Sequence, residues 1–370
     1  MPGAAARQQN TTCTETKKMI NRVLRFLGKL LIALMVLILL AALAFGVFVF
    51  IKNRGKNSLA GKASVKAPSI AGAGISSDES TSSDWEDDWI IYKGDIYDYN
   101  DDIRTFLIMG IDKTDEEVKG VYGEIDGGQA DALFLVVCNP HDKSIKVIGI
   151  NRNTMTDVDI YDEQGKYVRT VTAQIAVQHG FGDGLEKSCE LQKYAVSKLF
   201  YSLSIHGYVA VNMSAIPVIN DAVGGVDVTV RESFDTDSYS FKSSEKVHLD
   251  GSMAYSYLHD RDVSKLASAD RRMLRQKDYL SAYIDKLRDS ARSDPGLVAD
   301  IFLTVQRQMT TDMTPDEVLY LSTTTASYTY SQGDFYLLDG YTNVGGAFEE
   351  FHPNMDKLLD MMVDIFYEKV

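Results

Sequence analysis

Two aspartates and one arginine stand at the ends of apolar runs that are typical of buried strands. Asp112 ends the run FLIMGID, Asp131 opens the run ADALFLVV, and Arg152 follows the run SIKVIGIN. Mg²⁺ in proteins commonly takes one or two carboxylates together with phosphate oxygens, and strand ends can bring carboxylates together. These residues are therefore candidates for phosphate chemistry. The alternatives are turn capping by the aspartates and a surface position for the arginine.

A second group of candidates lies in the segment ADRRMLRQKDYL, residues 269–280. At 100° per residue along a helix, Arg272, Arg275 and Gln276 fall on one stripe, beside an apolar stripe that would pack. Guanidinium groups form paired hydrogen bonds with phosphate oxygens, so this stripe suits a pyrophosphate better than a sugar hydroxyl. The alternative is a solvated basic face that pairs with nearby aspartates.

The elements that would position these residues alternate between strands and helices. The runs IRTFLIMGI, ADALFLVVCN and SIKVIGIN predict three buried strands, and GGVDV from residue 224 predicts a tight turn into a strand. Helical periodicity predicts helices over residues 185–203, 214–223, 251–259, 268–292, 296–309, 315–326 and 354–367. This mixture predicts an α/β domain over residues 103–370, with a central sheet covered on both faces.

The segment before this domain predicts attachment to a membrane. Residues 30–51 form an uncharged apolar run of the length that spans a bilayer, and the basic residues of 1–29 favour a cytoplasmic start. A cleaved signal peptide is the alternative, but its apolar region is typically shorter. Residues 52–102 are rich in Gly, Ser and then acidic residues, which predicts a flexible stalk.

Charge and motif content exclude several classes of function. The net charge is −14, and residues 1–84 contain 11 of the 38 basic but 4 of the 52 acidic residues, so the remainder is strongly acidic and does not favour nucleic-acid binding. GxSxG, HExxH, Walker A and zinc-spaced Cys/His sets are missing from the sequence. Cys138 lies in an apolar run, which favours a free buried thiol over a disulfide with Cys189.

Seven short segments follow the apolar run in a fixed order: FLIMGID, QADALFLVV, INRNTM, GYVAVNM, AVGGVDV, HLDGSMAYSYLHDR and ADRRMLRQ. Together they resemble the LytR-CpsA-Psr (LCP) family of cell-wall glycopolymer ligases. The resemblance implies a central mixed β-sheet flanked by helices, in a single-pass protein of the cell membrane whose C-terminal domain is extracytoplasmic. It also implies a Mg²⁺-dependent phosphotransferase. Such an enzyme moves a teichoic-acid-like or capsular glycopolymer from a polyprenyl (undecaprenyl-type) pyrophosphate carrier, held in an apolar cleft, to peptidoglycan.

The resemblance also assigns roles to residues of the matching segments. Asp112 and Asp131 would hold Mg²⁺ and act in catalysis with Arg152, unless one aspartate is instead the base for the acceptor sugar hydroxyl. The residues assigned to the pyrophosphate are Arg261, Arg272, Arg275 and Gln276.

Three positions depart from the family pattern. Gln129 stands where many members have Arg, Asn153 where Asp is usual, and His259 where an RxR pair begins. Each lost arginine removes a charge-assisted contact of about 1.5–3 kcal/mol, which predicts weaker or altered substrate binding.

Two other functions remain open. The lost arginines favour a non-catalytic protein that binds the lipid-linked polymer. A membrane-tethered envelope regulator is the other alternative. The predicted tail of residues 1–29 counts against it, because the tail is too short for a DNA-binding domain.

Overall fold

The computed structural model describes residues 41–62, 66–70, 88–115, 117–118, 120, 127–262, 265–294, 296–345 and 348–370. It divides into two compact units, residues 1–54 and 55–370. In the first unit, residues 41–54 are helical. Among the described residues, no helix is both long and apolar enough to cross a membrane. The predicted tail of residues 1–29, and residues 30–40 of the predicted span, lie outside the described residues.

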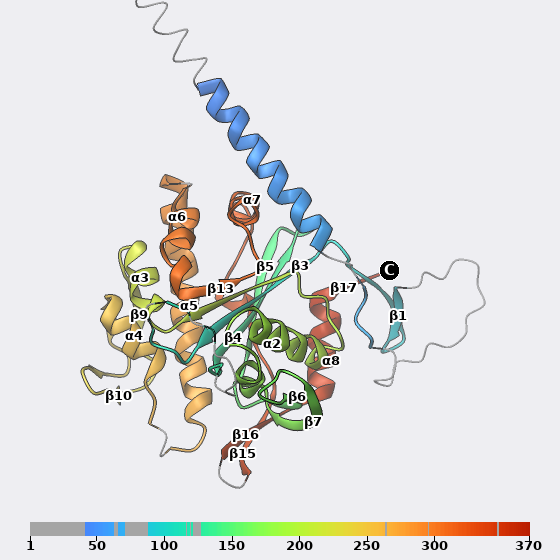
Figure 1. Ribbon diagram of the computed structural model, residues 1–370, viewed down its shortest axis with the longest axis vertical. Coiled ribbons are helices and arrows are strands. Elements are labelled where there is room, and N and C mark those ends of the chain that lie inside the picture. The colour runs from blue at the N-terminus through green and yellow to red at the C-terminus, as the bar shows by residue number, and fades with distance from the viewer. Residues whose placement is uncertain are drawn as a thin grey trace, which may run out of the picture. The chain divides into compact units, whose positions relative to one another are not determined.

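The second unit is built on a six-stranded mixed sheet (Figure 1). Strand β3 pairs in parallel with β8 and antiparallel with β4, which is antiparallel to β5. At the edges, β13 is antiparallel to β8 and β14 is parallel to β5. In sheet order the strands are β13 (Met309–Thr311), β8 (Gly207–Asn212), β3 (Arg104–Ile111), β4 (Ala130–Asn139), β5 (Ser144–Ile150) and β14 (Phe335–Leu337). The prediction of a mixed sheet is confirmed.

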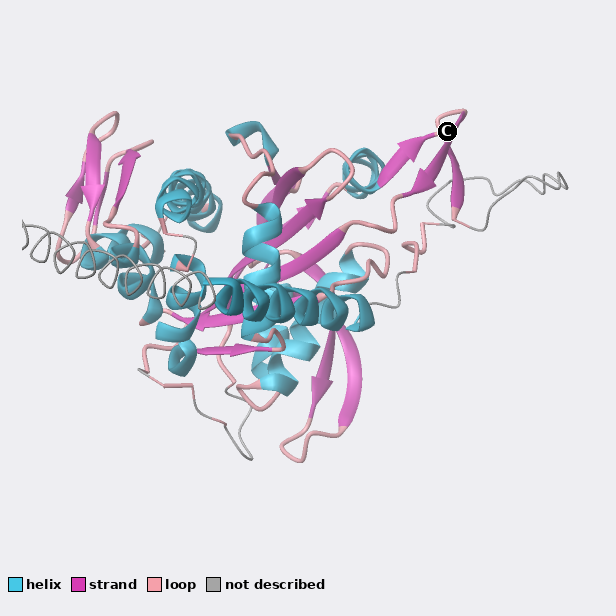
Figure 2. Cartoon of the chain, turned by 90° about the horizontal axis from the view of Figure 1, so that it is seen from above, coloured by secondary structure: helices cyan, strands magenta, loops and turns pink. Residues whose placement is uncertain are grey.

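Helices cover both faces of this sheet (Figure 2). Alternate side chains of the central strands, such as Leu107 and Leu135, pack against α2 (Glu186–Leu199) and α8 (Met355–Phe366). The intervening side chains, such as Phe106 and Phe134, face the other layer. That layer consists of α5 (Ser268–Ser293), α6 (Leu297–Thr304) and α7 (Pro315–Thr325). The predicted α/β architecture with flanking helices is therefore confirmed.

A smaller subdomain with its own apolar cluster adjoins α5. It contains α3 (Ala215–Ala222), α4 (Gly251–His259), the antiparallel pair β9 (Val226–Thr229) and β12 (Lys246–Leu249), and the hairpin β10 (Phe234–Asp235) and β11 (Ser240–Phe241). The tight turn predicted before β9 is present, because Gly224 and Gly225 have φ values of +79° and +80°.

The described part of this unit also contains two further hairpins and three short 3₁₀ helices. The hairpins are β6 (Met155–Tyr161) with β7 (Tyr167–Gln174) and β15 (Gly340–Gly345) with β16 (Phe348–Pro353). The 3₁₀ helices are η1 (Ile175–Phe181), η2 (Gln306–Gln308) and η3 (Gln332–Asp334). The helix predicted over 296–309 ends earlier, at Thr304, because η2 and β13 follow it.

The flexible stalk predicted over residues 52–102 is wrong for much of its length. Residues 55–62 are helical, and β1 (Trp89–Tyr92) and β2 (Asp95–Tyr99) form a sheet with the C-terminal β17 (Tyr367–Lys369). Ile70 and Tyr99 are 1% and 6% exposed and belong to the main core. The local composition could not reveal these strands, because their partner β17 lies at the other end of the chain.

Both described cysteines are free and buried, as predicted for Cys138, and they form no disulfide. Burial raises the pKa of Cys138 to about 12.

Candidate functional site

The ends of three central strands bring the first group of predicted residues together. Ile111 of β3 pairs with Ala130 of β4, and Leu133 of β4 pairs with Ile150 of β5. Asp112, Asp131 and Arg152 therefore lie at the same end of the sheet. Arg152 Nη1 is 2.5 Å from Asp131 Oδ1 in an ion pair that is largely buried.

Asp112 lies beside this ion pair, partly enclosed by protein but with its side chain exposed. Burial raises the pKa of Asp112, the neighbouring Asp131 raises it further, and a hydrogen bond from Gln129 N opposes both effects. That bond, from Gln129 N to Asp112 Oδ1, is 2.6 Å long. Asp112 is thus a carboxylate whose charged form is disfavoured by its surroundings.

Helix α5 carries Arg272 to the other side of Asp131. Its Nη2 atom donates to Asp131 Oδ2 and to the Asp131 carbonyl oxygen, both at 3.2 Å. The Arg272 side chain is 4% exposed, so the alternative of a solvated basic face is wrong. Burial lowers the pKa of Arg272 to about 10, and the positive charges of Arg261 and Arg152 act in the same direction.

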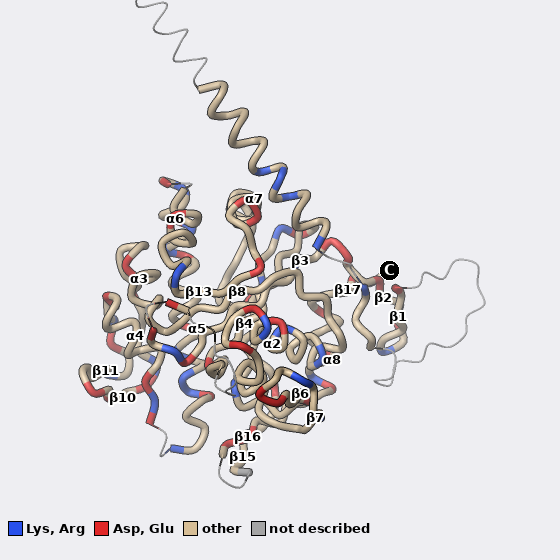
Figure 3. Tube along the Cα trace, viewed as in Figure 1, with Lys and Arg blue, Asp and Glu red and all other residues tan. Residues whose placement is uncertain are grey.

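Arg261 follows α4 in the chain and lies close enough to Arg152 and Asp131 to be affected by their charges. Its Nη1 atom donates to Ser268 Oγ at 3.3 Å. Burial lowers the pKa of Arg261, as does the positive charge of Arg152, whereas Asp131 and Glu349 oppose that shift. Three arginines therefore surround one carboxylate, in a chain whose acidic residues are spread over many elements (Figure 3). Burial disfavours the charged forms of Arg261 and Arg272, and an anion in contact with them would offset this cost.

The other two predicted residues of α5 contact α4 instead of the aspartates. Arg275 Nε donates to the Tyr257 carbonyl at 3.1 Å, its Nη2 donates to the Asp260 carbonyl, and Gln276 Nε2 donates to the Leu258 carbonyl at 3.2 Å. Carbonyls at a helix C-terminus lack partners within the helix and carry partial negative charge. The structure therefore places Arg275 and Gln276 as caps of α4.

A cavity of about 540 Å³ opens beside this cluster. Asp131, Arg261 and Arg272 line it together with residues of the β10–β11 hairpin and of the loop after α4. The cluster is therefore reachable by a ligand, and two of its three arginines face the space that such a ligand would fill.

A buried histidine, His179, contacts the loop that carries Gln129. His179 Nδ1 lies 3.0 Å from the Gly128 carbonyl oxygen, and His179 Nε2 lies 3.8 Å from Cys189 Sγ. Burial lowers the pKa of His179, which favours its neutral form. Spacing in the sequence gave no sign of this support, because η1 follows the loop by some fifty residues.

The model of the LytR_cpsA_psr family matches residues 69–345, which is more than half of the chain. The chain belongs to the LytR_cpsA_psr family. The match begins within the segment expected to be a stalk, which agrees with the burial of Ile70.

The relatives compared with this chain have low sequence identity to it. A polyisoprenyl-teichoic acid–peptidoglycan teichoic acid transferase TagU from Bacillus mycoides is 27% identical over 214 residues, which cover 58% of this chain and 62% of that protein. The match thus spans less than two thirds of the relative's length.

Two solved structures show the same fold. B. subtilis TagV has a TM-score of 0.55 at 22% identity, covering 71% of this chain and 95% of that one. TagT bound to LI-WTA has a TM-score of 0.51 at 20% identity, covering 71% and 89%.

The structure gives two of the departures from the LytR_cpsA_psr pattern a local partner. Gln129 Oε1 accepts a hydrogen bond from Arg152 Nη2, so a neutral acceptor stands where a second arginine would repel the first. Asn153 is buried, and its Nδ2 donates to Glu349 Oε2 at 3.4 Å. An aspartate at position 153 would face that carboxylate.

The third departure lies in the cavity wall. His259 Nδ1 is 2.9 Å from Asp260 Oδ1, and the ring stacks on Tyr255 at 5.1 Å between centroids. His259 lines the same cavity as Arg261. It therefore replaces an arginine at a position that a ligand can reach.

Glu349 is a residue of the site that sequence reasoning missed. It lies on β16, beyond the segments that carry the resemblance, and its Oε1 accepts from Ala267 N at 2.6 Å. It connects the loop before α5 with Asn153. A local pattern could not reveal it, because its partners lie about 80 and 200 residues away.

The two predicted metal ligands fit a divalent cation in charge and donor type. Within the described part of the chain, Asp112 Oδ2 makes no hydrogen bond or ion pair, and the mutual repulsion of Asp112 and Asp131 is one that Mg²⁺ would relieve. Among the described residues no group of three or more His, Cys, Asp or Glu side chains could hold a metal. Phosphate oxygens would have to complete the coordination.

Proposed function

We propose that this protein is a membrane-anchored phosphotransferase that moves a glycopolymer from a polyprenyl pyrophosphate carrier to peptidoglycan. The observation that carries the proposal is the cluster of Arg152, Arg261 and Arg272 around Asp131, beside a cavity that admits a ligand. Burial lowers the pKa values of Arg261 and Arg272, so an incoming di-anion strongly stabilises their charged forms, and a pyrophosphate offers several oxygens to all three arginines.

The names of similar proteins support the same substrate class. TagU of Bacillus mycoides is named as a transferase of teichoic acid from a polyisoprenyl carrier to peptidoglycan, and TagT has been solved with LI-WTA bound. For this chain we infer a polymer of the same kind, either teichoic-acid-like or capsular.

In the proposed reaction, the hydroxyl oxygen of a peptidoglycan sugar attacks the phosphorus that bears the glycan. The bond from that phosphorus to the oxygen of polyprenyl phosphate breaks, and polyprenyl phosphate leaves. Arg152, Arg261 and Arg272 would bind the phosphate oxygens and stabilise the charge that develops on them. The products are polyprenyl phosphate and a polymer joined to peptidoglycan by a phosphodiester.

The aspartates divide the remaining roles. Asp112 is the better proton acceptor for the hydroxyl because its pKa is raised and its Oδ2 is without a partner among the described residues. Both oxygens of Asp131 face arginines, which it orients. Where Asp112 and Asp131 instead hold Mg²⁺, the cation would supply charge neutralisation at the pyrophosphate, and Asp112 would then be a ligand in place of the base.

Membrane attachment through residues 30–51 is part of the proposal. In the helical residues 41–54, Leu43, Phe45 and Phe50 are 64%, 68% and 68% exposed. Large apolar side chains in this position suit a hydrocarbon environment better than water. The catalytic unit would then lie on the extracytoplasmic side, where peptidoglycan is found.

The carrier chain would lie in the apolar layer between the sheet and α5. Ile108 and Val136 of the sheet and Leu280 and Ile284 of α5 are only partly buried there. Side chains that are apolar and incompletely covered are what a polyprenyl chain requires.

The test is a transfer assay with the full chain in detergent, a polyprenyl pyrophosphate-linked saccharide and peptidoglycan. We expect Mg²⁺-dependent release of polyprenyl phosphate together with saccharide bound to peptidoglycan. Tight binding of the lipid without any release would contradict the proposal and favour the alternative of a non-catalytic binding protein. Failure to bind the lipid would contradict both.

A further inference from the structure

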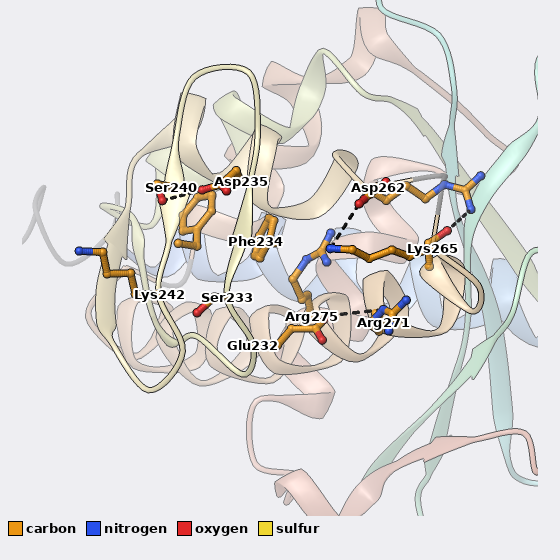
Figure 4. Close-up of a pocket in the computed structure, with 13 residues that line it drawn as sticks. Glu232, Ser233, Phe234, Asp235, Ser240, Lys242, Asp262, Lys265, Arg271 and Arg275 are labelled. Atoms are coloured by element: carbon orange, nitrogen blue, oxygen red, sulfur yellow. Dashed lines mark hydrogen bonds and ion pairs between the residues drawn. The ribbon is translucent and has the colours of Figure 1, made fainter.

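A second cavity of about 700 Å³ adjoins the candidate active site (Figure 4). It lies between the β10–β11 hairpin, the loop after α4 and the first turns of α5. The two cavities share Asp235, Arg261 and Asp262 as lining residues. A ligand whose phosphate groups lie at the arginine cluster would therefore extend into this second space past Arg261.

The lining of this cavity is polar and carries both signs of charge. Of its 13 residues, two are apolar, Phe234 and Phe241. The remainder are three serines, three acidic residues and five basic residues, namely Lys242, Arg261, Lys265, Arg271 and Arg275. In a chain with a net charge of −14, a wall with more basic than acidic residues is a local reversal of sign.

The two phenyl rings belong to the frame of the cavity. Phe234 and Phe241 stack at 4.8 Å, and the Arg275 guanidinium lies 4.0 Å from the centroid of Phe234. Arg231 at the base of the hairpin forms two hydrogen bonds with Asp278 of α5, 2.7 and 2.9 Å long. These contacts fix the hairpin to α5, so the cavity is formed before any ligand enters it.

Lys265 is the cation best placed to meet a ligand. Its chain extends over the cavity toward Phe234 (Figure 4), and Nζ lies 3.3 Å from Asp262 Oδ2. The Arg271–Glu232 pair on the opposite wall is longer, at 3.9 Å. Partly exposed ion pairs of this kind cost little free energy to break. Once they are broken, the cations can bind an anion and the carboxylates can accept hydrogen bonds from hydroxyl groups.

We propose that this second cavity binds the anionic sugar units next to the pyrophosphate and so selects which polymer is transferred. The inference rests on the proposed function for its connection to transfer. Its chemistry is that of a glycan that carries phosphate or carboxylate groups: cations for the charged groups, and serine hydroxyls and carboxylates for the sugar hydroxyls. The polar lining excludes the polyprenyl chain.

Binding is measured first, because it does not depend on turnover. The full chain in detergent is titrated with maltose 1-phosphate, digalacturonate and maltose, and Kd is taken from ligand-observed NMR. We expect one or both anionic sugars to bind about tenfold more tightly than neutral maltose. Preference for the phosphate or for the carboxylate identifies the charged group that the cavity accepts. Equal Kd values for all three sugars would overturn the proposal.

Lys265→Glu and the exposed control Lys166→Glu locate the binding. We expect Lys265→Glu to weaken the anionic sugar about tenfold and Lys166→Glu to leave it unchanged. Equal effects of the two substitutions would mean non-specific attraction and would also overturn the proposal.

The transfer assay separates this inference from the proposed function. Lys265→Glu should raise KM more for a donor that carries several anionic sugar units than for a donor with one neutral sugar. Arg152→Ala should abolish transfer of both donors. Transfer that is indifferent to Lys265→Glu refutes the glycan site alone, whereas sugar binding at Lys265 without transfer by the unmodified protein refutes the proposed function alone.

Discussion

Asp131 is the residue on which the charges of the site converge. Its two carboxylate oxygens face Arg152 at 2.5 Å and Arg272 at 3.2 Å, and it also offsets the lowered pKa of Arg261. Without a ligand, Asp131 pairs with two of these arginines, and Asp131 and Glu349 together partly offset the charge of Arg261. Phosphate oxygens entering the cavity would take over these arginines, which makes the cluster a preorganised anion site.

Asp112 should control the acid limb of the pH–rate profile. Burial and Asp131 raise its pKa above 3.8, so the proton-accepting carboxylate is lost as the pH falls through that raised value. We expect the rate to decline at a pH above that of an ordinary aspartate. Asp112→Asn should lower kcat about 100-fold or more and abolish this limb. A profile that Asp112→Asn leaves unchanged would exclude Asp112 as the base.

Asn153 and Glu349 should prove coupled. Asn153→Asp would place a second carboxylate against Glu349 Oε2, at a position now joined by a 3.4 Å hydrogen bond. We expect a loss of about 1–3 kcal/mol in the free energy of unfolding, because a buried donor becomes a like charge.

A double-mutant cycle tests this coupling. Adding Glu349→Gln should restore most of the stability lost in Asn153→Asp, since the amide can donate to the new carboxylate. Strictly additive effects of the two substitutions would contradict the contact.

Among the secondary-structure elements, α5 has two separate roles, although the residues responsible lie on one stripe of the helix. Arg272 reaches Asp131, while Arg275 and Gln276 cap the C-terminus of α4. All three are buried on the same helical face. One helix thus delivers a charge to the site and holds the preceding helix, whose end carries Arg261.

Arg275→Met should therefore affect stability more than substrate affinity. The apolar chain fills a similar volume but leaves the Tyr257 and Asp260 carbonyls without their donors and removes the contact with Phe234. We expect a loss of about 2–4 kcal/mol in unfolding free energy, measured by denaturant titration.

Arg261→Ala is the matched comparison for Arg275→Met. Arg261 donates a single 3.3 Å hydrogen bond to Ser268 and lines the cavity. Its loss should weaken pyrophosphate binding with little loss of stability. The reverse ranking of the two variants would contradict the division of labour along α5.

The sequence predicted the elements of the main sheet and helices well, because their apolar periodicity is local. The strands that begin at Arg104, Ala130 and Ser144, and the helix from Ser268, lie within a few residues of their predicted positions. It failed for β1 and β2, whose partner β17 lies some 270 residues away. Residue composition could not distinguish an edge hairpin completed by the C-terminus from a stalk.

The candidate site was predictable in part. Strand ends brought Asp112, Asp131 and Arg152 together as expected, and helical spacing placed Arg272 on one stripe with Arg275 and Gln276, although it did not show that this stripe is buried. The capping role of Arg275 was not predictable, since it depends on the angle between α4 and α5. Glu349 and His179 were also missed, because each acts through main-chain or amide contacts far along the chain.

For the whole molecule, a buried histidine should set part of the pH dependence of stability. His206 is 4% exposed, and its Nδ1 accepts from Thr105 N at 3.2 Å, between β3 and β8. Burial, together with the positive charge of Arg104, lowers the pKa of His206 to about 4. Because the folded state disfavours the charged form, the stabilisation is complete above pH 6.5 and is lost as the pH falls toward 4.

This loss should amount to about 3 kcal/mol between pH 6.5 and 4, from a shift of about 2.5 pKa units. Denaturant titration at several pH values measures it. His206→Asn, which keeps a neutral acceptor, should flatten the slope, whereas the exposed His248→Asn should not. A slope that His206→Asn leaves intact would assign the acid sensitivity to other groups.

The proposed function depends on the arginine cluster at the end of the sheet, and Arg152 is the most direct probe of that cluster. The measurement is the initial rate of polyprenyl phosphate release from a polyprenyl pyrophosphate-linked saccharide, compared between Arg152→Ala and Arg169→Ala, which removes an exposed arginine of β7. Loss of one preorganised charge donor should lower the rate of Arg152→Ala about 100-fold or more and leave Arg169→Ala near the unmodified protein. Equal rates for the two variants would contradict a pyrophosphate site at Asp131.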